Sequence, residues 1–253
     1  MLAEILPLQV FAFFLVFVRI GAVLMFIPGF GEPFIPVRIR LALALVMTVS
    51  LGAVVANTLP PLPDTPIQLF FVIAGELVIG VLIGGVARIT MSALHVAGTV
   101  IAFLTSLGFA MFLDPTQGTQ ASLIATFLNL LGLVLIFATN LHLVMIQAMY
   151  DSYVLFAPGT TIPVGDFAEL AIRLVSGAFR IGIQMAAPFI VYGLVFYVSL
   201  GIVARLMPQF QVFFIALPLQ IMVGLSLLAV VLPALMMWFL NYYEATVAQL
   251  LVR

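Results

Sequence analysis

The chain contains no cysteine and very little charge. Without cysteine it can form no disulfide, no thiolate nucleophile and no cysteine metal site. Its two histidines, His95 and His142, lie far apart in the sequence, so we expect no metal site and no cofactor. Charged residues are only 7% of the 253, whereas soluble domains contain about 25%. All eight cations are arginines and form no basic stripe, so nucleic acid is not an expected partner.

Apolar residues are abundant instead, at 65% of the chain. Several runs are long enough to cross a bilayer as helices, and the alternating pattern of a membrane barrel is absent. We therefore predict an all-α, polytopic membrane protein with kinked helices and helical hairpins. The seven predicted runs are Leu8–Ile27, Leu41–Leu59, Ile67–Met91, Ala93–Leu113, Leu123–Tyr150, Ile181–Val203 and Val212–Leu240.

Proline and polar residues divide the chain. Pro188, Pro218 and Pro233 lie inside the last two runs, where each removes a backbone hydrogen bond. Lipid tolerates such a break only where protein or water replaces the bond, so we expect these helices to pack against partners. The longest polar break is Tyr150–Leu170, and we place the domain boundary within it, between residues 165 and 166.

Arginine placement predicts the orientation in the membrane. If all seven runs cross, six arginines fall on one side and only Arg205 on the other. Because arginine-rich loops and ends favour the cytoplasmic side, we expect a cytoplasmic C-terminus. The six arginines are Arg38, Arg40, Arg88, Arg173, Arg180 and Arg253.

Glu76, Gly80, Gly84 and Arg88 are spaced four apart and form one stripe on a helix. Two glycines in such a stripe favour close packing of membrane helices, and we predict a subunit contact here. The alternative is an ion pathway through the two charged residues. Arg19, near the end of the first run, is expected to extend its side chain toward the interface.

No catalytic or nucleotide-binding motif occurs, so we do not expect an enzyme. A different class of function remains open at this point. Glu76, Arg88, His95 and His142 could line the path of a small-molecule or ion transporter. An inverted repeat would favour that interpretation, and the sequence shows none.

Five motifs occur together in this order: VRIGAVLMFIPGFGEPFIPVRIRLALAL, GELVIGVLIGG, GFAMFLDP, NLHLVMI and GIVARLMPQFQVFFIALPLQIMVGL. With them the chain resembles the FliR family of flagellar export-gate proteins from Phe14 to about Leu240. The resemblance implies one copy in the gate of the flagellar basal body, assembled with FliP-like and FliQ-like subunits and contacted by an FlhB-like protein. It also implies a FliP-like part over residues 1–165, a FliQ-like helical hairpin over 166–253, and export of unfolded proteins.

The segment Ser106–Ser122 interrupts the apolar sequence. Pro115 lacks an N–H and disfavours helix at Asp114, so the run must end there. One interpretation is a helix end with its aromatics in the core. The other, which the resemblance supports, is a plug that closes the export channel with apolar side chains. The predicted plug residues are Gly108, Phe109, Met111, Phe112, Asp114, Pro115 and Gly118.

The last predicted site is the turn of the helical hairpin, at Arg205, Pro208 and Gln209. Pro208 is expected to end the first helix of the hairpin, because the residue before a proline avoids helical geometry. We predict that Arg205 pairs with a carboxylate or with carbonyls at a helix C-terminus, and that the turn lies at one end of the assembly.

Overall fold

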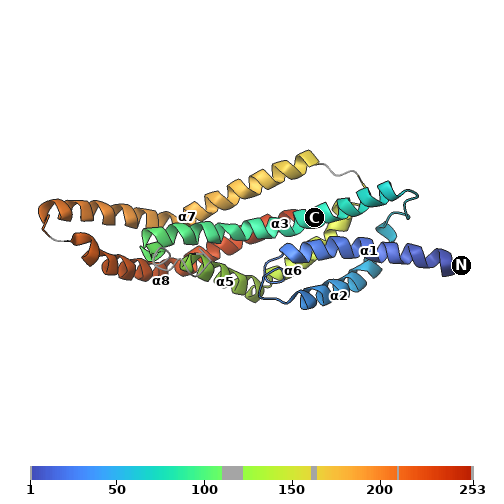
Figure 1. Ribbon diagram of the computed structural model, residues 1–253, viewed down its shortest axis with the longest axis horizontal. Helices are drawn as coiled ribbons and strands as arrows, with labels where there is room; N and C mark the ends of the chain where they lie inside the picture. The colour runs from blue at the N-terminus through green and yellow to red at the C-terminus, as the bar shows by residue number, and fades with distance from the viewer. Residues whose placement is uncertain (1, 110–121, 161–163, 210, 252–253) are drawn as a thin grey trace. The chain divides into compact units, whose positions relative to one another are not determined.

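The structure of the protein, a computed structural model, describes residues 2–109, 122–160, 164–209 and 211–251. Over these residues it is built from helices without strands (Figure 1), so the predicted all-α class is confirmed. The α-helices are α1 (Leu2–Phe26), α2 (Val37–Val55), α3 (Pro66–Leu104), α5 (Leu123–Ala138), α6 (Leu141–Leu155), α7 (Val164–Leu206) and α8 (Val212–Val247). The short 3-10 helices are η1 (Ala56–Thr58), η2 (Leu107–Phe109) and η3 (Ala248–Leu250).

The prediction of seven separate runs is wrong. Within the described ranges, five helices are long and apolar enough to cross a membrane, and a bent pair could form a sixth crossing. The third and fourth runs form the single helix α3, because only Ser92 separates them and a lone serine does not stop a helix. The fifth run is divided into α5 and α6 by a bend of 74°. Asn140, in the left-handed conformation, lies at that bend.

Three of these helices exceed the thickness of a bilayer. Helices α3, α7 and α8 contain 39, 43 and 36 residues. At 1.5 Å per residue each is about 55–65 Å long, roughly twice the hydrocarbon core of a membrane. The cytoplasmic C-terminus stays a prediction, because it depends on seven simple crossings and the described residues contain five or six candidates.

The chain divides into two compact units, each built from segments that are distant in sequence. One contains Met1–Thr90, Ile136–Leu174 and Tyr243–Arg253, and the other contains Met91–Leu135 and Val175–Tyr242. The sequence-based boundary at 165 and 166 concerns likeness to companion subunits, which these units do not test. It stays a prediction.

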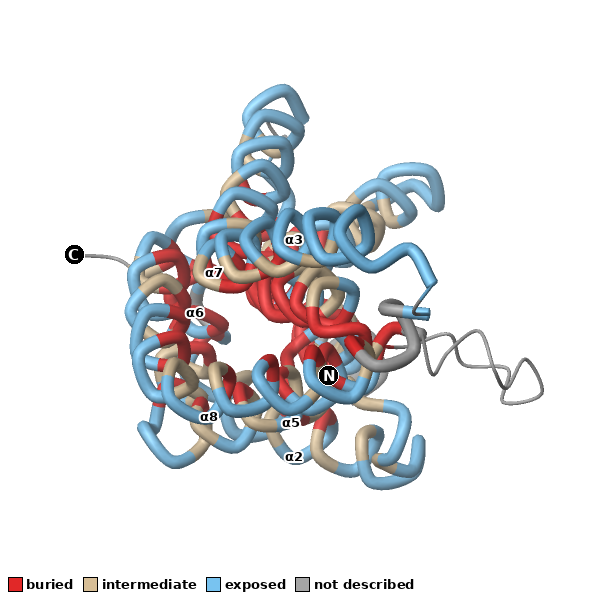
Figure 2. Tube along the Cα trace, turned by 90° about the vertical axis from the view of Figure 1, so that its left-hand side faces the viewer, coloured by how far each residue is buried: buried red, intermediate tan, exposed pale blue. Residues whose placement is uncertain are grey.

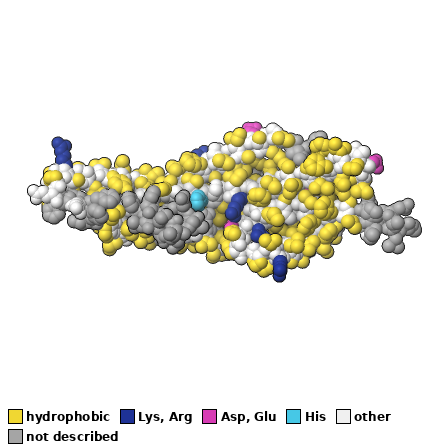
Figure 3. All heavy atoms as spheres, in the orientation of Figure 1, with side chains coloured by type: hydrophobic (Ala, Val, Ile, Leu, Met, Phe, Trp, Pro, Cys, Tyr) yellow, Lys and Arg dark blue, Asp and Glu magenta, His cyan; other side chains and the backbone are white. Residues whose placement is uncertain are grey.

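Much of the helical surface is apolar and exposed. Figure 2 shows helices with buried residues on one side and exposed residues on the other. Only three residues of α2 are buried, whereas Val46 and Val49 are more than 60% exposed. Figure 3 shows hydrophobic side chains over most of the visible surface. An apolar surface of this extent must be covered by lipid or by protein.

Within the first unit, α1 and α3 pack closely at two glycines of the predicted stripe. A Cβ atom on Gly80 would lie 2.6 Å from the carbonyl oxygen of Arg19, and one on Gly84 would lie 2.7 Å from that of Val23. A side chain at either position would therefore force the two backbones apart. Gly85, the next residue of α3, has no atom within 4 Å of such a Cβ.

This geometry predicts a difference between neighbouring glycines. Gly80→Ala and Gly84→Ala should each destabilise the fold by about 1–3 kcal/mol, as overpacking does. Gly85→Ala is the matched control and should be tolerated. The level of membrane-inserted protein and its thermal unfolding in detergent would measure this. Equal behaviour of the three variants would contradict the close contact between α1 and α3.

Candidate functional site: a buried arginine network and the end of α3

Arg19 lies in the middle of the first unit and makes a buried ion pair with Glu76. Arg19 comes from α1 and Glu76 from α3, and each side chain is 1% exposed. The guanidinium binds the carboxylate through two bonds: Nε donates to Oε2 at 2.5 Å and Nη2 donates to Oε1 at 2.9 Å. Such two-point contacts fix orientation and are stronger than bonds between neutral groups.

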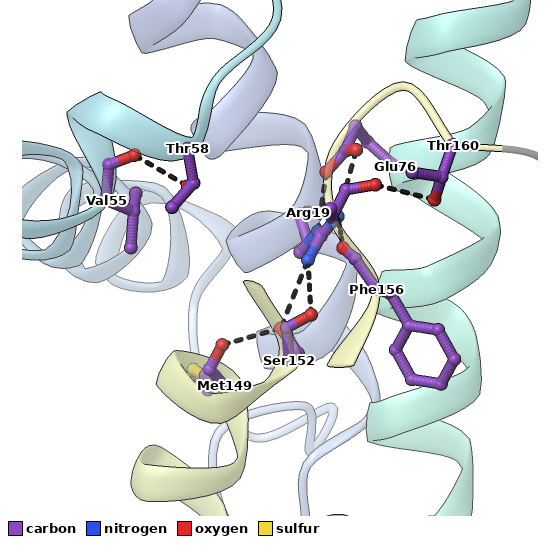
Figure 4. A network of polar contacts seen from close by, with 9 residues as sticks. Arg19, Val55, Thr58, Glu76, Met149, Ser152, Phe156 and Thr160 are labelled. Carbon is purple, nitrogen blue, oxygen red and sulfur yellow. Dashed lines mark hydrogen bonds and ion pairs between the residues drawn. The ribbon is translucent and has the colours of Figure 1, made fainter. Parts of the chain in front are cut away.

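The remaining N–H groups of Arg19 bind the end of α6 (Figure 4). Nη1 donates to the carbonyl oxygen of Ser152 at 3.0 Å and to its hydroxyl at 3.3 Å. Nη2 also donates to the carbonyl oxygen of Phe156, at 2.9 Å. These carbonyls belong to the last turn and the C-cap of α6, where a positive charge is favourable. All five donors of the guanidinium therefore have acceptors.

The Tyr153 ring completes the site. It lies 4.2 Å from the Arg19 guanidinium carbon, within the range of a cation–π contact. The expectation that Arg19 extends to the membrane interface is therefore wrong. Glu76, Ser152 and Phe156 supply acceptors for all five N–H groups of Arg19 inside the protein, so the charged group does not need to reach water. In the sequence, the only indication of this pair is that Arg19 and Glu76 carry opposite charges within separate apolar runs.

The other charged residue of the stripe, Arg88, has a different partner. Its Nη1 lies 2.5 Å from Oε1 of Glu32, in the segment between α1 and α2. Arg88 is 48% exposed, so this pair lies at the surface and contributes little stability. Gly80 and Gly84 contact α1 of the same chain. A further contact of this stripe with another subunit stays a prediction.

The residues of the transporter alternative do not share a polar pathway within the first unit. Glu76 pairs with Arg19 and Arg88 with Glu32. The ring of His142 stacks on Phe137, with 4.8 Å between the centroids. His95 belongs to the other unit and is exposed. Glu76, Arg88 and His142 therefore each contact a different partner among the described residues.

The predicted plug segment has both described ends in the second unit. Residues 110–121, and with them Met111, Phe112, Asp114, Pro115 and Gly118, lie outside the described residues. Before them, α3 ends at Leu104 and the chain turns at Ser106, whose φ of 59° is left-handed. Gly108 and Phe109 follow in η2.

After the segment, Ser122 begins α5. Its hydroxyl accepts a bond from the amide of Ala125 at 3.4 Å, as an N-cap does, and donates to the carbonyl oxygen of Gly98 at 3.4 Å. A Cβ on Gly98 would lie 2.3 Å from the Cα of Ala125, so α3 and α5 approach closely here. The segment thus starts at the end of α3 and returns to α3 through Ser122.

The residues of the predicted hairpin turn lie at the end of α7 and directly after it. Helix α7 ends at Leu206, two residues before Pro208, and α8 starts at Val212. Arg205, Pro208 and Gln209 are all exposed. The part of the chain that the structure describes supplies no ion pair for Arg205, so the predicted partner would have to come from elsewhere.

These observations define an all-α membrane protein that contains a buried Arg19–Glu76 ion pair and whose helices expose apolar surface. Residues 10–246 match the family described as "Bacterial export proteins, family 1", and the chain belongs to that family. It is 44% identical over 237 residues to the flagellar biosynthetic protein FliR of Caulobacter vibrioides. These residues are 93% of this chain and 94% of that protein. The predicted resemblance is confirmed.

More distant relatives carry the same name. The FliR protein of Bacillus subtilis is 30% identical over 241 residues, 93% of this chain and 92% of that protein. The FliR protein of Escherichia coli is 30% identical over 221 residues, 85% and 82% of the two chains. The part of this chain that matches the family, residues 10–246, contains both the arginine network and the end of α3.

Replacing Arg19 or Glu76 alone should destabilise the protein more than replacing both residues together. Arg19→Met or Glu76→Leu alone leaves one buried charge without its partner and should cost about 3–5 kcal/mol. The double change Arg19→Met with Glu76→Leu leaves no charge and should recover much of that loss. Protein level and thermal unfolding in a double-mutant cycle would measure the coupling between the two positions.

The exposed pair between Glu169 and Arg173 is the matched control. Removing it with Glu169→Gln or Arg173→Gln should leave protein level unchanged, because water screens exposed charges. If the buried and exposed pairs respond alike, the network does not stabilise the fold as described.

Proposed function

We propose that this chain is a non-enzymatic subunit of the flagellar type III protein export gate. Its membership in the bacterial export proteins, and FliR relatives across nearly its full length, make it a component of the flagellar export apparatus. In the proposed gate it helps to form the channel through which unfolded flagellar proteins leave the cell, and it closes that channel at rest. Its location would be the inner membrane, at the base of the flagellum, with its C-terminus in the cytoplasm.

The observation that carries this proposal is the mismatch between helix length and bilayer thickness. Helices α7 and α8 are each roughly twice as long as the hydrocarbon core. They carry exposed apolar side chains from Val164 to Leu206 and from Leu219 to Trp238. Lipid cannot cover all of that surface if the helices stand upright, so further protein chains have to cover the rest. FliP-like and FliQ-like subunits, together with an FlhB-like protein, are the proposed partners.

A second element of the proposal is the plug, Ser106–Ser122. Phe109, Met111 and Phe112 would exclude water and ions from the closed channel. Methionine has a flexible thioether side chain that can repack when a substrate passes. Support comes from the apolar sequence of the segment and from its two ends, which are attached to the same helix, α3.

The plug is tested by removing its apolar bulk. Deleting Gly108–Gln117, or changing Phe109, Met111 and Phe112 together to Gly, should let small ions pass while the gate still assembles. Cells that express the whole gate would show this as increased conductance or a change of cytoplasmic pH.

The matched control keeps the bulk and changes only the shape. Phe109→Leu, Met111→Leu and Phe112→Leu together should leak much less than the glycine variant, because the segment stays apolar. A deletion variant that assembles and remains as tight as wild type would make Ser106–Ser122 a simple connector.

Assembly is tested at the α7–α8 turn. Arg205 is exposed and has no ion pair within the described chain, so we expect its partner on another subunit. Arg205→Ala should weaken export, measured as swimming motility, with near-normal protein levels. Arg205→Lys keeps the charge and should preserve part of the function. Normal motility of Arg205→Ala would contradict the role, and purification of the chain without companions would contradict the subunit proposal.

A further inference from the structure

One buried side chain, Gln220 of α8, joins three helices of the second unit. It is 2% exposed. Its Nε2 donates to the carbonyl oxygen of Leu104, at the end of α3, at 2.7 Å, and to the hydroxyl of Tyr197 in α7 at 3.1 Å. The hydroxyl of Tyr192, also in α7, donates to the backbone carbonyl of Gln220 at 3.0 Å. The amide thus connects the α7–α8 hairpin to α3.

The bond to Leu104 satisfies a carbonyl at a helix end. Leu104 is the last residue of α3, and the last carbonyls of a helix have no partner within it. A buried carbonyl without a donor is unfavourable, so the end of α3 depends on a donor from another element. Gln220 is that donor.

Two glycines of the α7–α8 hairpin allow it to pack directly against the end of α3, at Leu104 and Thr105. A Cβ on Gly193 of α7 would lie 2.8 Å from Cδ2 of Leu104. A Cβ on Gly224 of α8 would lie 2.5 Å from Cγ2 of Thr105. Gly224 is one helical turn after Gln220, so hydrogen bonding and close packing act on neighbouring residues.

The backbone turns sharply next to this contact. Ser106, 4% exposed, has a φ of 59°, a conformation that costs energy for any residue with a Cβ and that glycine adopts freely. Such a conformation persists only where the surrounding structure enforces it. The hydrogen bond from Gln220 to Leu104 lies two residues earlier in the chain.

We propose that Gln220 is a positioning residue, through which the α7–α8 hairpin sets the direction in which the chain leaves α3. The inference rests on the proposed function, since the segment that begins at Ser106 is the one proposed to close the channel. The hairpin cannot move away from α3 without breaking the Gln220–Leu104 bond. The position of the hairpin and the start of the segment are therefore coupled.

The test is hydrogen exchange on the intact gate, purified with its partners. Gln220→Met keeps the approximate volume and removes both side-chain bonds. Exchange of the backbone amides of residues 105–109 should become about tenfold faster, as expected for the loss of one buried hydrogen bond. Exchange in residues 124–135 of α5 should not change. Gln184→Met, at an exposed position of α7, is the matched control and should leave both regions unchanged.

Adding Ser106→Gly to Gln220→Met tests whether Gln220 acts on the turn at Ser106. Because glycine accepts the left-handed turn freely, Ser106→Gly combined with Gln220→Met should restore slow exchange at residues 105–109. A double variant that exchanges as fast as Gln220→Met would mean that the bonds of Gln220 stabilise the end of α3 without acting on the turn at Ser106, which overturns the proposal. If Gln220→Met does not assemble, Tyr197→Phe removes a single acceptor of the same amide and should give a smaller increase.

Ion leakage of the same variants separates this inference from the proposed function. Faster exchange at residues 105–109 together with a leak supports both. Faster exchange without a leak supports the positioning role and contradicts the channel-closing role of the segment. Unchanged exchange in Gln220→Met and in Tyr197→Phe overturns the positioning role, whatever the leak.

Discussion

A charged side chain in an apolar interior must have all its hydrogen bonds made, and the first unit of this protein is organised around that requirement. Arg19 uses its five N–H groups on Glu76, Ser152 and Phe156. Each of these residues must be in place, so the network fixes α1, α3 and the end of α6 relative to one another. The glycines Gly80 and Gly84 make this possible, because they let α1 and α3 come close enough for the pair to form.

The second unit uses the same principle without charge. Gln220 provides the donor that the end of α3 lacks, as Arg19 does for the end of α6. In both units a long polar side chain completes a helix terminus, and small residues next to it permit close approach. Helix ends are the points where a membrane protein has the fewest internal partners for its backbone. Both candidate sites lie at such ends.

The sequence predicted the class and the apolar elements well, because run length and composition report directly on membrane helices. The sequence did not predict where individual helices begin and end. Ser92 looked like a gap between two runs and lies inside α3, whereas Asn140 divides a run that looked continuous. Proline and charge patterns do not reveal a left-handed residue. Glu76 was recognised as important, but its partner was missed because Arg19 lies 57 residues away, and pairing at that distance depends on how α1 and α3 pack.

The partners of Arg19 lie at different distances along the sequence, so they are synthesised at different times. Glu76 is synthesised 57 residues after Arg19, and Ser152 only 133 residues after it. A nascent chain that ends before α6 can bind two donors of the guanidinium and leaves three open. The early helices are therefore synthesised before this polar site can be completed. All five donors of Arg19 have acceptors only when the end of α6 has been made.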